Sequence, residues 1–377
     1  MHIGIVTSEF PPDIGGVETY AAEFAQSLAA MGHKVSVFVH KKHQITKQAT
    51  GITLFPLLGF SRQLDRPHLL SSDVDAWHVM NAAHSWLALE TDKPVVVSIH
   101  GNDFLNPYPL TIRPPFSSYL WRLKKLIKPL DIWLSRKLTQ SMLHKALPAA
   151  RIILSNSTYT QDVFLKKFPQ CQGKTLISYV GVGERFLASP LTNKNNATPH
   201  FLTVSRLSEP RKNVDKVLQA LGKLNSQFDF RYTVIGDGSE KLSLEATANK
   251  LGLAEKVTFL GRQPIEQVID SMAATDLFIL TSSTMANSHE GFGIVYLEAA
   301  ACGTPSLATH QAGAIEAVGN ERSGFFVEEP TVENIKQALA RFLTHEYSFN
   351  RHACREFASG FTWQKVVEHA LPYYSQD

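Results

Sequence analysis

The first forty residues alternate between strand and helix patterns in a way that few folds allow. Ile3–Thr7 is a short apolar run, typical of a buried strand, and a turn rich in glycine and proline follows it. Val17–Met31 then carries apolar residues at helical spacing, and Lys34–His40 is a second apolar run. This order predicts a βαβ unit, and therefore a parallel sheet with right-handed crossovers. Val95–Ile99 and Arg151–Ser155 predict further short strands of the same sheet.

The same alternation restarts after a polar stretch at Ser189–His200, which we interpret as a linker. The strands expected after it are Phe201–Ser205, Arg231–Gly236, Val257–Leu260, Asp276–Thr281 and Pro305–Ala308. The helices expected between them are Val214–Leu224, Glu240–Leu251, Ile265–Ala273 and Gly293–Ala301. The sequence therefore predicts an α/β protein with two Rossmann-like, doubly wound domains, at 1–188 and 189–361. A last helical stretch at 362–377 can cap the second domain or return to the first, and we expect it to pack on the first.

Composition excludes several other classes of protein. Hydrophobic residues make up 44% of the chain and charged residues 19%, which is typical of a globular protein. Cys171, Cys302 and Cys354 are scattered, so neither a disulfide framework nor a zinc site is indicated. The N-terminal apolar stretch is too short for a signal peptide, and no run approaches the roughly 18 apolar residues of a membrane span. We therefore expect a cytoplasmic protein that reaches a membrane only peripherally, on the inner face of the cell membrane.

The stretch from Glu290 to Glu298 carries the most specific chemical pattern. It follows a predicted strand, and Glu290-Gly291-Phe292-Gly293 opens a helix. Open α/β sheets bind ligands beyond the carboxyl ends of their strands, where glycines allow close approach and helix N–H groups attract anions. Two carboxylates fit beside an anion if they accept hydrogen bonds from hydroxyl groups, such as those of a sugar and a ribose. The residues alone leave a second interpretation open, which is an ordinary helix start with a glycine turn and nearby acidic residues.

Two cations follow the first predicted strand of the second half. Arg206 lies at the end of that strand, and Lys212 precedes the helix that begins near Asn213. Positive charge at a helix N-terminus disfavours the helix, so both cations make sense if a diphosphate completes the site. We interpret Arg211, between them, as a solvated loop residue.

Three weaker candidates follow other predicted strands. Gly15 and Gly16 form a turn that suits phosphate, but the turn lacks the glycine spacing of a dinucleotide-binding fingerprint. His100 and Asp103 follow a buried strand, where a histidine can donate to a substrate hydroxyl, although a lone histidine more often has a structural role. Gly236 lies in a tight turn that needs only a structural explanation. No spacing of histidines and carboxylates predicts a metal site.

Taken in this order, the motifs resemble those of the retaining glycosyltransferases of the GT-B fold, specifically glycosyltransferase family 4, over nearly the whole chain. The matching stretches are Phe10-Pro11-Pro12 with Gly15-Gly16-Val17, Ser205-Arg206-Leu207 with Lys212-Asn213, Ile235-Gly236-Asp237-Gly238, Glu290 to Ala299, and Ala301-Cys302-Gly303-Thr304-Pro305. The most specific of these is the pair Glu290 and Glu298, which matches the paired-glutamate signature of that family. The resemblance implies two Rossmann-like domains that face a central cleft. It also implies retaining transfer of a hexose or N-acetylhexosamine from a nucleotide-diphosphate sugar.

The same resemblance implies roles for individual residues. Arg206 and Lys212 would hold the diphosphate of a UDP- or GDP-linked donor without a metal ion or any other cofactor. Glu298 would bind the ribose, and Glu290 would face the donor sugar. The implied catalytic set is His100, Arg206, Lys212 and Glu290. The implied donor-binding set is Gly15, Gly16, Gly236, Arg262, Gly291, Phe292, Gly293, Ile294 and Glu298, and Asp103 is a candidate on the acceptor side.

We expect the acceptor to be a glycan or a lipid-linked molecule, bound by the first domain, in the synthesis of bacterial surface polysaccharide or glycoconjugate. Two alternatives stay open, namely a GT-B nucleotide-sugar epimerase, which needs no acceptor, and a catalytically silent protein that binds sugar nucleotides. A nicotinamide-dependent oxidoreductase is excluded because its glycine fingerprint is missing. Two departures from the family pattern are the long polar loop Ser282–His289 and Asn213, which stands where glycine is frequent.

Residues 111–151 form a basic stretch with interleaved aromatic and aliphatic side chains. Its basic residues are Arg113, Arg122, Lys124, Lys125, Lys128, Arg136, Lys137, Lys145 and Arg151, and its acid is Asp131. Such a stretch can lie on an anionic membrane, or it can be a solvated helix face that covers the first domain. A nucleic-acid partner is not expected, because the net charge is only +3 and no nucleic-acid motif is present.

Overall fold

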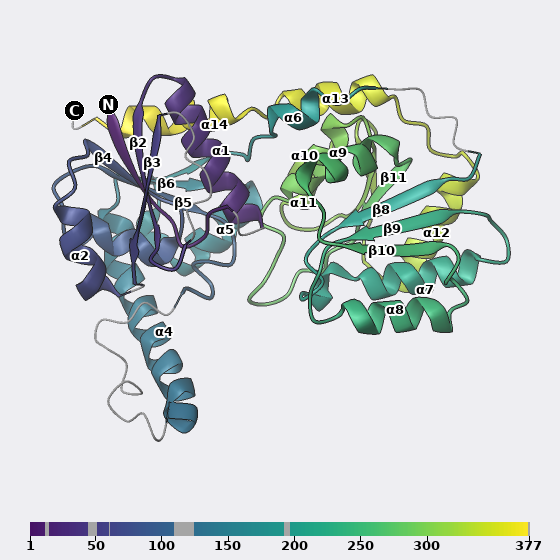
Figure 1. Cartoon of the computed structure of the whole chain (residues 1–377), viewed down its shortest axis with the longest axis horizontal. Coiled ribbons are helices and arrows are strands. Elements are labelled where there is room, and N and C mark those ends of the chain that lie inside the picture. Colours follow the sequence, from purple (N-terminus) through teal and green to yellow (C-terminus); the bar gives the residue numbers. More distant parts are fainter. Residues whose placement is uncertain (12–14, 44–50, 60, 109–123, 192–196, 376–377) are drawn as a thin grey trace. The chain divides into compact units, whose positions relative to one another are not determined.

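A computed structural model of the chain describes residues 1–11, 15–43, 51–59, 61–108, 124–191 and 197–375. The chain forms two compact units, Met1–Gly181 with Trp363–Asp377 and Val182–Thr362, and each contains one parallel sheet with helices on its faces (Figure 1). The turn residues 12–14 and the linker residues 192–196 of the expected scheme lie outside the described residues. Within the described part of the chain, no helix is long and apolar enough to cross a membrane.

The N-terminal unit has a seven-stranded sheet in its described part, with the strand order β3-β2-β1-β4-β5-β6-β7. Its strands are β1 His2–Val6, β2 Lys34–His40, β3 Ile52–Leu58, β4 Ala76–Val79, β5 Val95–Ile99, β6 Ile152–Ser155 and β7 Thr175–Ile177. Its helices are α1 Gly16–Ala30, α2 Arg62–Leu70, η1 Ala82–Leu89, α4 Lys124–Ala149, α5 Thr158–Lys167, η3 Pro169–Cys171, α14 Trp363–Ala370 and η5 Leu371–Tyr373. All strand pairs in this sheet run parallel, as the βαβ pattern predicts.

The C-terminal unit has a six-stranded sheet in its described part, with the order β10-β9-β8-β11-β12-β13. Its strands are β8 His200–Val204, β9 Arg231–Ile235, β10 Val257–Gly261, β11 Leu277–Leu280, β12 Ser306–Thr309 and β13 Gly324–Val327. Its helices are α6 Glu184–Leu187, η4 Pro210–Lys212, α7 Val214–Leu224, α8 Lys241–Lys250, α9 Ile265–Ala274, α10 Ile294–Ala301, α11 Ala314–Ala317, α12 Val332–Leu343 and α13 Arg351–Ser359. The helices α7, α8 and α12 cover one face of this sheet, and α9, α10 and α11 cover the other (Figure 1).

Apart from the edge strands β3, β7 and β10, which are partly exposed, the strands of both sheets are short runs rich in Val, Ile, Leu and Phe whose side chains are almost all buried. Helices on both faces of a parallel sheet remove water from both sides of each strand, which is why these strands lack the alternation of an exposed sheet. The expected bounds of β2, β5 and α7 agree with the structure, and most other expected elements differ by one or two residues. The sequence analysis did not name β3, β4, β7 or β13, nor the helices α2, α12 and α13.

The C-terminal segment belongs to the N-terminal unit, where α14 packs against α1. The rings of Trp363 and Tyr20 meet edge to face, 5.2 Å apart. Tyr374 is buried, and its hydroxyl lies 2.5 Å from Nδ1 of His78 in β4. Burial of an aromatic residue at each end of the segment explains why this part of the chain is anchored there.

The strand order reverses direction once in each sheet. The reversal lies between β1 and β4 in the N-terminal sheet, and between β8 and β11 in the C-terminal sheet. At such a point the connections leave toward opposite faces of the sheet. Open α/β proteins bind their ligands beyond the carboxyl ends of the two strands at this point. The loops after β1 and β4, and those after β8 and β11, are therefore where each unit is expected to carry its functional residues.

Candidate functional site

Two loops at the carboxyl edge of the C-terminal sheet carry most of the charged candidates. One follows β8 and passes through the 3₁₀ turn η4 into α7, and the other follows β11 and passes through Glu290 into α10. Lys212 and Glu290 lie 78 positions apart in the sequence, yet the Lys212 ammonium donates to the Glu290 carboxylate. The two loops meet because β8 and β11 are neighbours in the sheet.

Three donors converge on a single oxygen of Glu290. Its Oε2 atom accepts from Lys212 Nζ at 2.6 Å, from Ser282 Oγ at 3.2 Å and from Arg211 Nη1 at 3.3 Å. The Oε1 atom has no hydrogen-bond partner among the described residues. Only 14% of the Glu290 side chain and 12% of the Lys212 side chain are exposed, so this ion pair is well shielded from water. The arrangement fixes the carboxylate and leaves one oxygen able to accept a hydrogen bond from a ligand.

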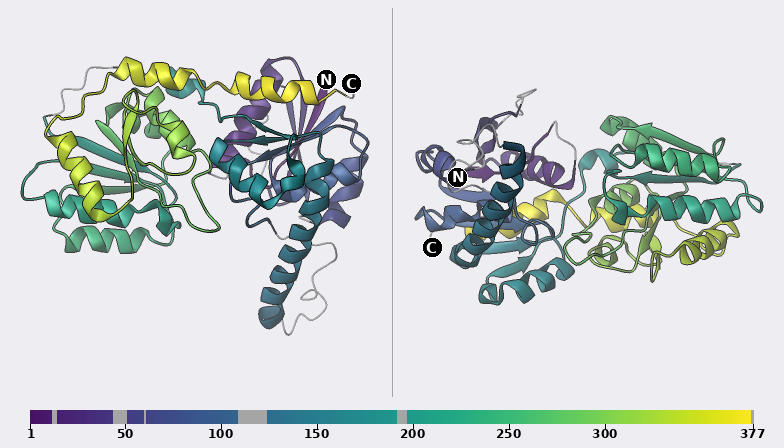
Figure 2. Two further views of the ribbon diagram at one scale, coloured as in Figure 1. Left: turned by 180° about the vertical axis from the view of Figure 1, so that it is seen from behind. Right: turned by 90° about the horizontal axis from the view of Figure 1, so that it is seen from below.

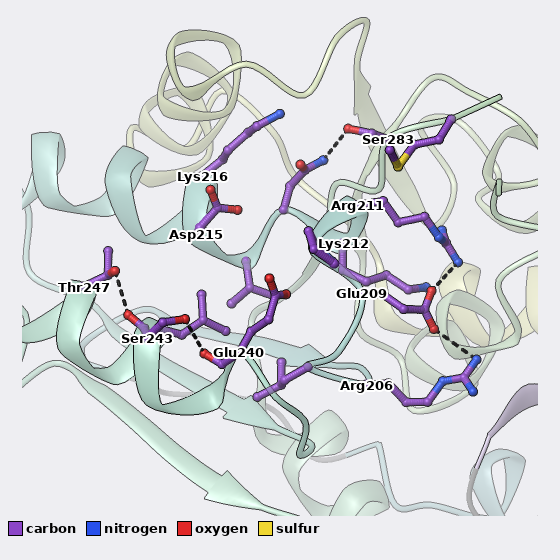
Figure 3. A pocket seen from close by; sticks show the side chains of 16 residues that line it. Arg206, Glu209, Arg211, Lys212, Asp215, Lys216, Glu240, Ser243, Thr247 and Ser283 are labelled. Atoms are coloured by element: carbon purple, nitrogen blue, oxygen red, sulfur yellow. Dashed lines mark hydrogen bonds and ion pairs between the residues drawn. The ribbon is translucent and has the colours of Figure 1, made fainter. Parts of the chain in front are cut away.

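A second carboxylate, that of Glu209, extends this network of charged side chains. Glu209 accepts from Arg206 at 3.1 Å and from Arg211 at 2.7 Å, so that it bridges the two guanidinium groups (Figure 3). The side chain of Arg206 is 58% exposed and that of Arg211 only 7%. The interpretation of Arg211 as a solvated loop residue is therefore wrong. It lies between the two carboxylates, Glu209 and Glu290, and links them.

The charge network controls the protonation of its acids. Burial by itself raises the pKa of the Glu290 carboxyl, but the charges of Lys212 and Arg211 and their hydrogen bonds outweigh burial and lower this pKa to about 2. The neighbouring His289 is buried, and burial together with the charge of Arg211 lowers the pKa of its imidazole to about 4. At neutral pH, Glu290 is therefore an anion and His289 is uncharged.

Asn213 ties the two loops together. Its φ of 55° lies in the left-handed region, which glycine and asparagine adopt most easily, and this explains why asparagine can stand where glycine is frequent. Its side-chain amide donates to the carbonyl of Thr281 and, at 2.8 Å, to the hydroxyl of Ser283. The backbone N–H of Ser283 in turn donates to the carbonyl of Arg211 at 2.7 Å. These bonds fix η4, and with it the basic side chains, against the loop after β11.

Two glycines of the implied donor-binding set occupy positions that a side chain could not. Gly236, directly after β9, has a φ of 137°, and a Cβ atom there would lie 1.8 Å from the carbonyl oxygen of Ser205. Gly293, before α10, has a φ of 92°, and its Cβ would lie 2.5 Å from the ring of Tyr296. The loops after β8, β9 and β11 can therefore pack closely at the edge of the sheet only with glycine at these two positions.

The remaining donor candidates of this unit lie along the same edge with different exposure. Arg262 is exposed and directly follows β10, whereas Ile294 and Glu298 are partly exposed, at the start and in the middle of α10. Phe292 is buried against the ring of Phe361, at a centroid distance of 5.8 Å. The Phe292 side chain therefore packs in the core, and only its backbone is available to a ligand.

A pocket of about 440 Å³ adjoins the charge network. Arg206, Glu209, Arg211 and Lys212 form one side of it, and residues of α7 and α8 form the other (Figure 3). Glu290, Glu298 and Gly236 are not among its lining residues. The pocket thus contains the cations Arg206, Arg211 and Lys212 of the candidate site but neither member of the glutamate pair. Within the described residues, no three His, Cys, Asp or Glu side chains are grouped as a metal ion would require.

In the N-terminal unit, His100 and Asp103 follow β5. The two oxygens of Asp103 accept from the backbone N–H groups of His100 and Ala82, both at 2.9 Å. Asp103 therefore holds the loop that carries His100. Burial lowers the pKa of the His100 imidazole, although the charges of Asp103 and Glu9 oppose this shift. His100 is consequently a neutral imidazole at physiological pH, able to donate or accept one hydrogen bond.

A row of buried, hydrogen-bonded side chains lies next to His100. The hydroxyl of Ser98 lies 2.7 Å from Nε2 of His78 and 3.2 Å from the hydroxyl of Tyr20. The ring of Tyr20 packs edge-on against His100, at a centroid distance of 4.5 Å. Burial lowers the pKa of the His78 imidazole to about 3, so this row of hydrogen-bonded side chains is uncharged at neutral pH. Through it the C-terminal Tyr374, which contacts His78, supports the environment of His100.

The tandem glycines begin α1. Gly15 is the N-cap residue in an extended conformation, and a Cβ there would lie 2.4 Å from Oε2 of Glu18. A Cβ at Gly16 would meet no atom within 4 Å in the described part of the chain. The two glycines thus differ, since a side chain at Gly15 would require the flexible end of Glu18 to move, whereas Gly16 faces open space within its own unit.

The sequence analysis missed several members of the charge network. Glu209 was not considered, Ser282 and His289 were noted only as the bounds of a loop, and Arg211 was assigned to solvent. Glu209 and Arg211 lie between the two recognised cations, so the alternation of charge from Arg206 to Lys212 was the signal that could have identified them. No comparable pattern in the sequence indicates His289 or Ser282, because their contacts depend on the path of the loop after β11.

Comparison with known proteins places this arrangement in a family. Residues 188–360 match the family model "Glycosyl transferases group 1", and residues 14–182 match the model "Glycosyltransferase Family 4". The chain belongs to glycosyltransferase family 4. It is an enzyme that transfers a sugar from a nucleotide-sugar donor to an acceptor, and its two parallel-sheet units are the two Rossmann-like domains of the GT-B fold.

One relative and two solved structures illustrate the family likeness. The chain is 24% identical over 376 residues to a GDP-mannose-dependent α-(1-6)-phosphatidylinositol monomannoside mannosyltransferase of Mycobacterium tuberculosis, with 90% of this chain and 88% of the relative covered. Sucrose-phosphate synthase from Thermosynechococcus elongatus has a similar fold, with a TM-score of 0.77, 17% identity, and 99% and 98% of the two chains covered. The Anabaena protein HepE, in complex with UDP and glucose, gives a TM-score of 0.72 at 18% identity, with 100% and 99% covered.

Proposed function

We propose that this glycosyltransferase moves a hexose or N-acetylhexosamine from a UDP- or GDP-linked donor to a glycan or lipid-linked acceptor, with retention of anomeric configuration and without a metal ion. The observation that carries the proposal is the network in which Arg206, Glu209, Arg211, Glu290 and Lys212 alternate in charge at the switch point of the C-terminal sheet. Three cations and two carboxylates leave an excess of positive charge, which suits a diphosphate.

In this proposal Lys212 and Arg206 contact the diphosphate and stabilise the negative charge that grows on it as the sugar departs. Arg206 is largely exposed and can turn toward the ligand, whereas Lys212 is fixed by Glu290. Donors that are held in place before the reaction stabilise developing charge at no cost in reorganisation, and this is often the largest electrostatic contribution to catalysis. These two side chains would thus supply the charge that a metal ion supplies in other enzymes.

The low pKa of Glu290 restricts what this residue can do. A carboxylate that stays ionised at neutral pH cannot donate a proton, so Glu290 is not a general acid of the glycosidase type. We assign its Oε1 atom to a hydroxyl of the donor sugar, and Glu298 to the ribose. Retention then follows from attack on the face that the diphosphate leaves. The bond from the acceptor oxygen to C1 forms as the bond from C1 to the phosphate oxygen breaks, and the acceptor proton passes to that phosphate oxygen.

In this proposal the N-terminal unit binds the acceptor, and two of its residues also contact the donor. His100 is a neutral imidazole held by the Asp103 loop, and we assign it to a hydroxyl of the reacting sugar. We assign Gly16 to the diphosphate, since it has room for a ligand in its own unit.

The name of the mycobacterial relative supports GDP-mannose as the first donor to test and an inositol lipid as the first lipid acceptor. We propose that the enzyme is cytoplasmic and acts in the synthesis of bacterial surface polysaccharide or glycoconjugate.

A product assay tests the proposal. The full chain is first screened by thermal shift with UDP- and GDP-linked hexoses and N-acetylhexosamines, because a ligand that binds the native state raises its apparent stability. The stabilising donor is then incubated with phosphatidylinositol monomannoside or with free oligosaccharides. We expect release of nucleoside diphosphate only when an acceptor is present, a product with the anomeric configuration of the donor, and unchanged turnover in EDTA.

Other results would replace the proposal. An epimerised donor in the absence of acceptor would indicate the epimerase alternative, and donor binding with no turnover on any acceptor would indicate a silent binding protein. An inverted product would contradict retention, and loss of turnover in EDTA would contradict metal independence.

A further inference from the structure

The helix α4 of the N-terminal unit extends well beyond the sheet and the other helices of that unit (Figures 1 and 2). Its C-terminal part packs against η1, where Leu143 and Leu147 are buried in the core. Its N-terminal part lies away from that core. One side of this part is buried, at Asp131, Ser135 and Thr139, and the other side is exposed.

The part of α4 from Leu130 to Leu138 exposes a concentration of large apolar side chains. Leu130 is 60% exposed, Trp133 57%, Leu138 40% and Ile132 38%. These four lie within nine positions, although exposed large hydrophobic residues are otherwise scattered over the described chain. Leu130 and Trp133 are three positions apart and so project from the same side of the helix. Exposed tryptophan and leucine cost stability in water, and their grouping on one projecting helix indicates that this surface is covered by a partner.

The charge around these side chains has one sign. Lys128, Lys137 and Lys145 are exposed, and Arg136 is partly exposed. Lys137 lies four positions after Trp133, on the same side of the helix. The acid within this part of α4 is Asp131, which is only 7% exposed. The surface that a partner meets is therefore apolar and positively charged, without an exposed carboxylate among the described side chains of α4.

We propose that the exposed side of α4, from Lys128 to Lys145, binds the surface of an anionic phospholipid bilayer. Leucine and tryptophan side chains enter the boundary between headgroups and acyl chains, while lysines remain at the level of the phosphates. The combination fits a bilayer better than the other partners of a basic surface. A nucleic acid offers phosphates but does not take up aliphatic side chains, and a second copy of α4 would bring its lysines together.

The proposal uses only the described part of the basic stretch expected at 111–151. Arg113, Arg122 and the rest of 111–123 lie outside the described residues, as do the side chains of Lys124 and Lys125. The inference is also independent of the proposed reaction, since it concerns binding to lipid and not transfer of a sugar. Failure of the one leaves the other open to test.

Vesicle co-sedimentation of the full chain tests the proposal. We expect the protein to sediment with vesicles of phosphatidylcholine that contain about one third phosphatidylglycerol, and to remain in the supernatant with phosphatidylcholine alone. Binding should weaken as salt is raised, because salt screens the lysine charges. Protein that stays in the supernatant with the anionic vesicles at low salt would overturn the proposal.

A matched pair of double variants locates the surface. Trp133→Ser with Lys137→Gln removes one apolar group and one cation from α4, and the partition onto anionic vesicles should fall roughly 50-fold, about 5-fold from the cation and about 10-fold from the tryptophan. Leu242→Ser with Lys250→Gln is the control and removes one exposed apolar side chain and one lysine from α8, where Leu242 is 79% exposed; it should leave binding unchanged. Circular dichroism checks that both variants are folded.

Three further outcomes would overturn the assignment. Equal loss of binding in the α8 variant would mean that α4 is not the binding surface. Salt-sensitive binding to duplex DNA without binding to vesicles would identify a nucleic acid as the partner. A dimer in sedimentation velocity that dissociates in the Trp133 variant would mean that a second copy covers α4.

Discussion

The replacement of Lys212 by methionine removes the ammonium group of the charge network and keeps most of its aliphatic stem. In the folded protein this ammonium lies 2.6 Å from Glu290 Oε2 and has only 12% of its side chain exposed. Glu290 keeps its bonds to Arg211 and Ser282 in the variant, so the fold survives. A hydrogen bond to a charged group contributes about 1.5–3 kcal/mol, and we expect the free energy of unfolding to fall by an amount in this range.

The effect of Lys212→Met on catalysis should be larger. If Lys212 stabilises the charge on the departing diphosphate, its removal costs about as much as the loss of one oxyanion donor, roughly 10²–10³ in kcat. Lys216→Met is the matched control, because Lys216 lines the same pocket but lies apart from the network (Figure 3). Initial rates at saturating donor and acceptor measure the difference. Turnover at the wild-type level in Lys212→Met, or an equal loss in Lys216→Met, would refute the reasoning.

Three further predictions concern stability, measured by urea unfolding. The pKa of the Glu290 carboxyl is 4.5 in the unfolded chain and about 2 in the folded protein, so its contribution to the free energy of unfolding is present above pH 4.5 and is lost as the pH falls toward 2. Glu290→Gln should remove this part of the pH dependence, which amounts to about 3 kcal/mol, and an unchanged pH profile would contradict the network. Asn213→Ala should be less stable than Asn213→Gly by about 1 kcal/mol, because alanine disfavours a φ of 55°; the reverse order would contradict this explanation. Tyr374→Phe leaves His78 Nδ1 buried without its partner and should cost about 1–3 kcal/mol, whereas no loss would mean that the contact is dispensable.

The sequence predicted the two parallel sheets because their strands are short apolar runs and their helices have regular apolar spacing. The helix Val214–Leu224 was predicted to the residue, since a strong periodicity begins directly after a polar residue. The strand Ile52–Leu58 was not named, because Pro56 and the irregular burial of its side chains weaken the pattern. No single segment of the sequence determines the order of the strands in the sheet, yet this order decides which loops lie next to each other.

The candidate site shows the same limit. Arg206, Lys212 and Glu290 were named because each follows a predicted strand. The resemblance to the family was predicted from the ordered motifs, and the two family models confirm it. Their contact through Arg211 could not be predicted, since periodicity does not give the direction of a side chain in the 3₁₀ turn η4. The position of Glu209 between two arginines depends on that same turn. The roles assigned to these residues stay predictions.

The account depends on the claim that the network around Lys212 holds the diphosphate of the donor. A crystal structure of the chain with UDP or GDP, whichever stabilises it more, tests this claim most directly. We predict density for the diphosphate within about 3 Å of the Lys212 ammonium and the Arg206 guanidinium. A nucleotide whose phosphates lie elsewhere, with the Lys212–Glu290 and Arg206–Glu209 pairs unaltered and uncovered, would contradict it.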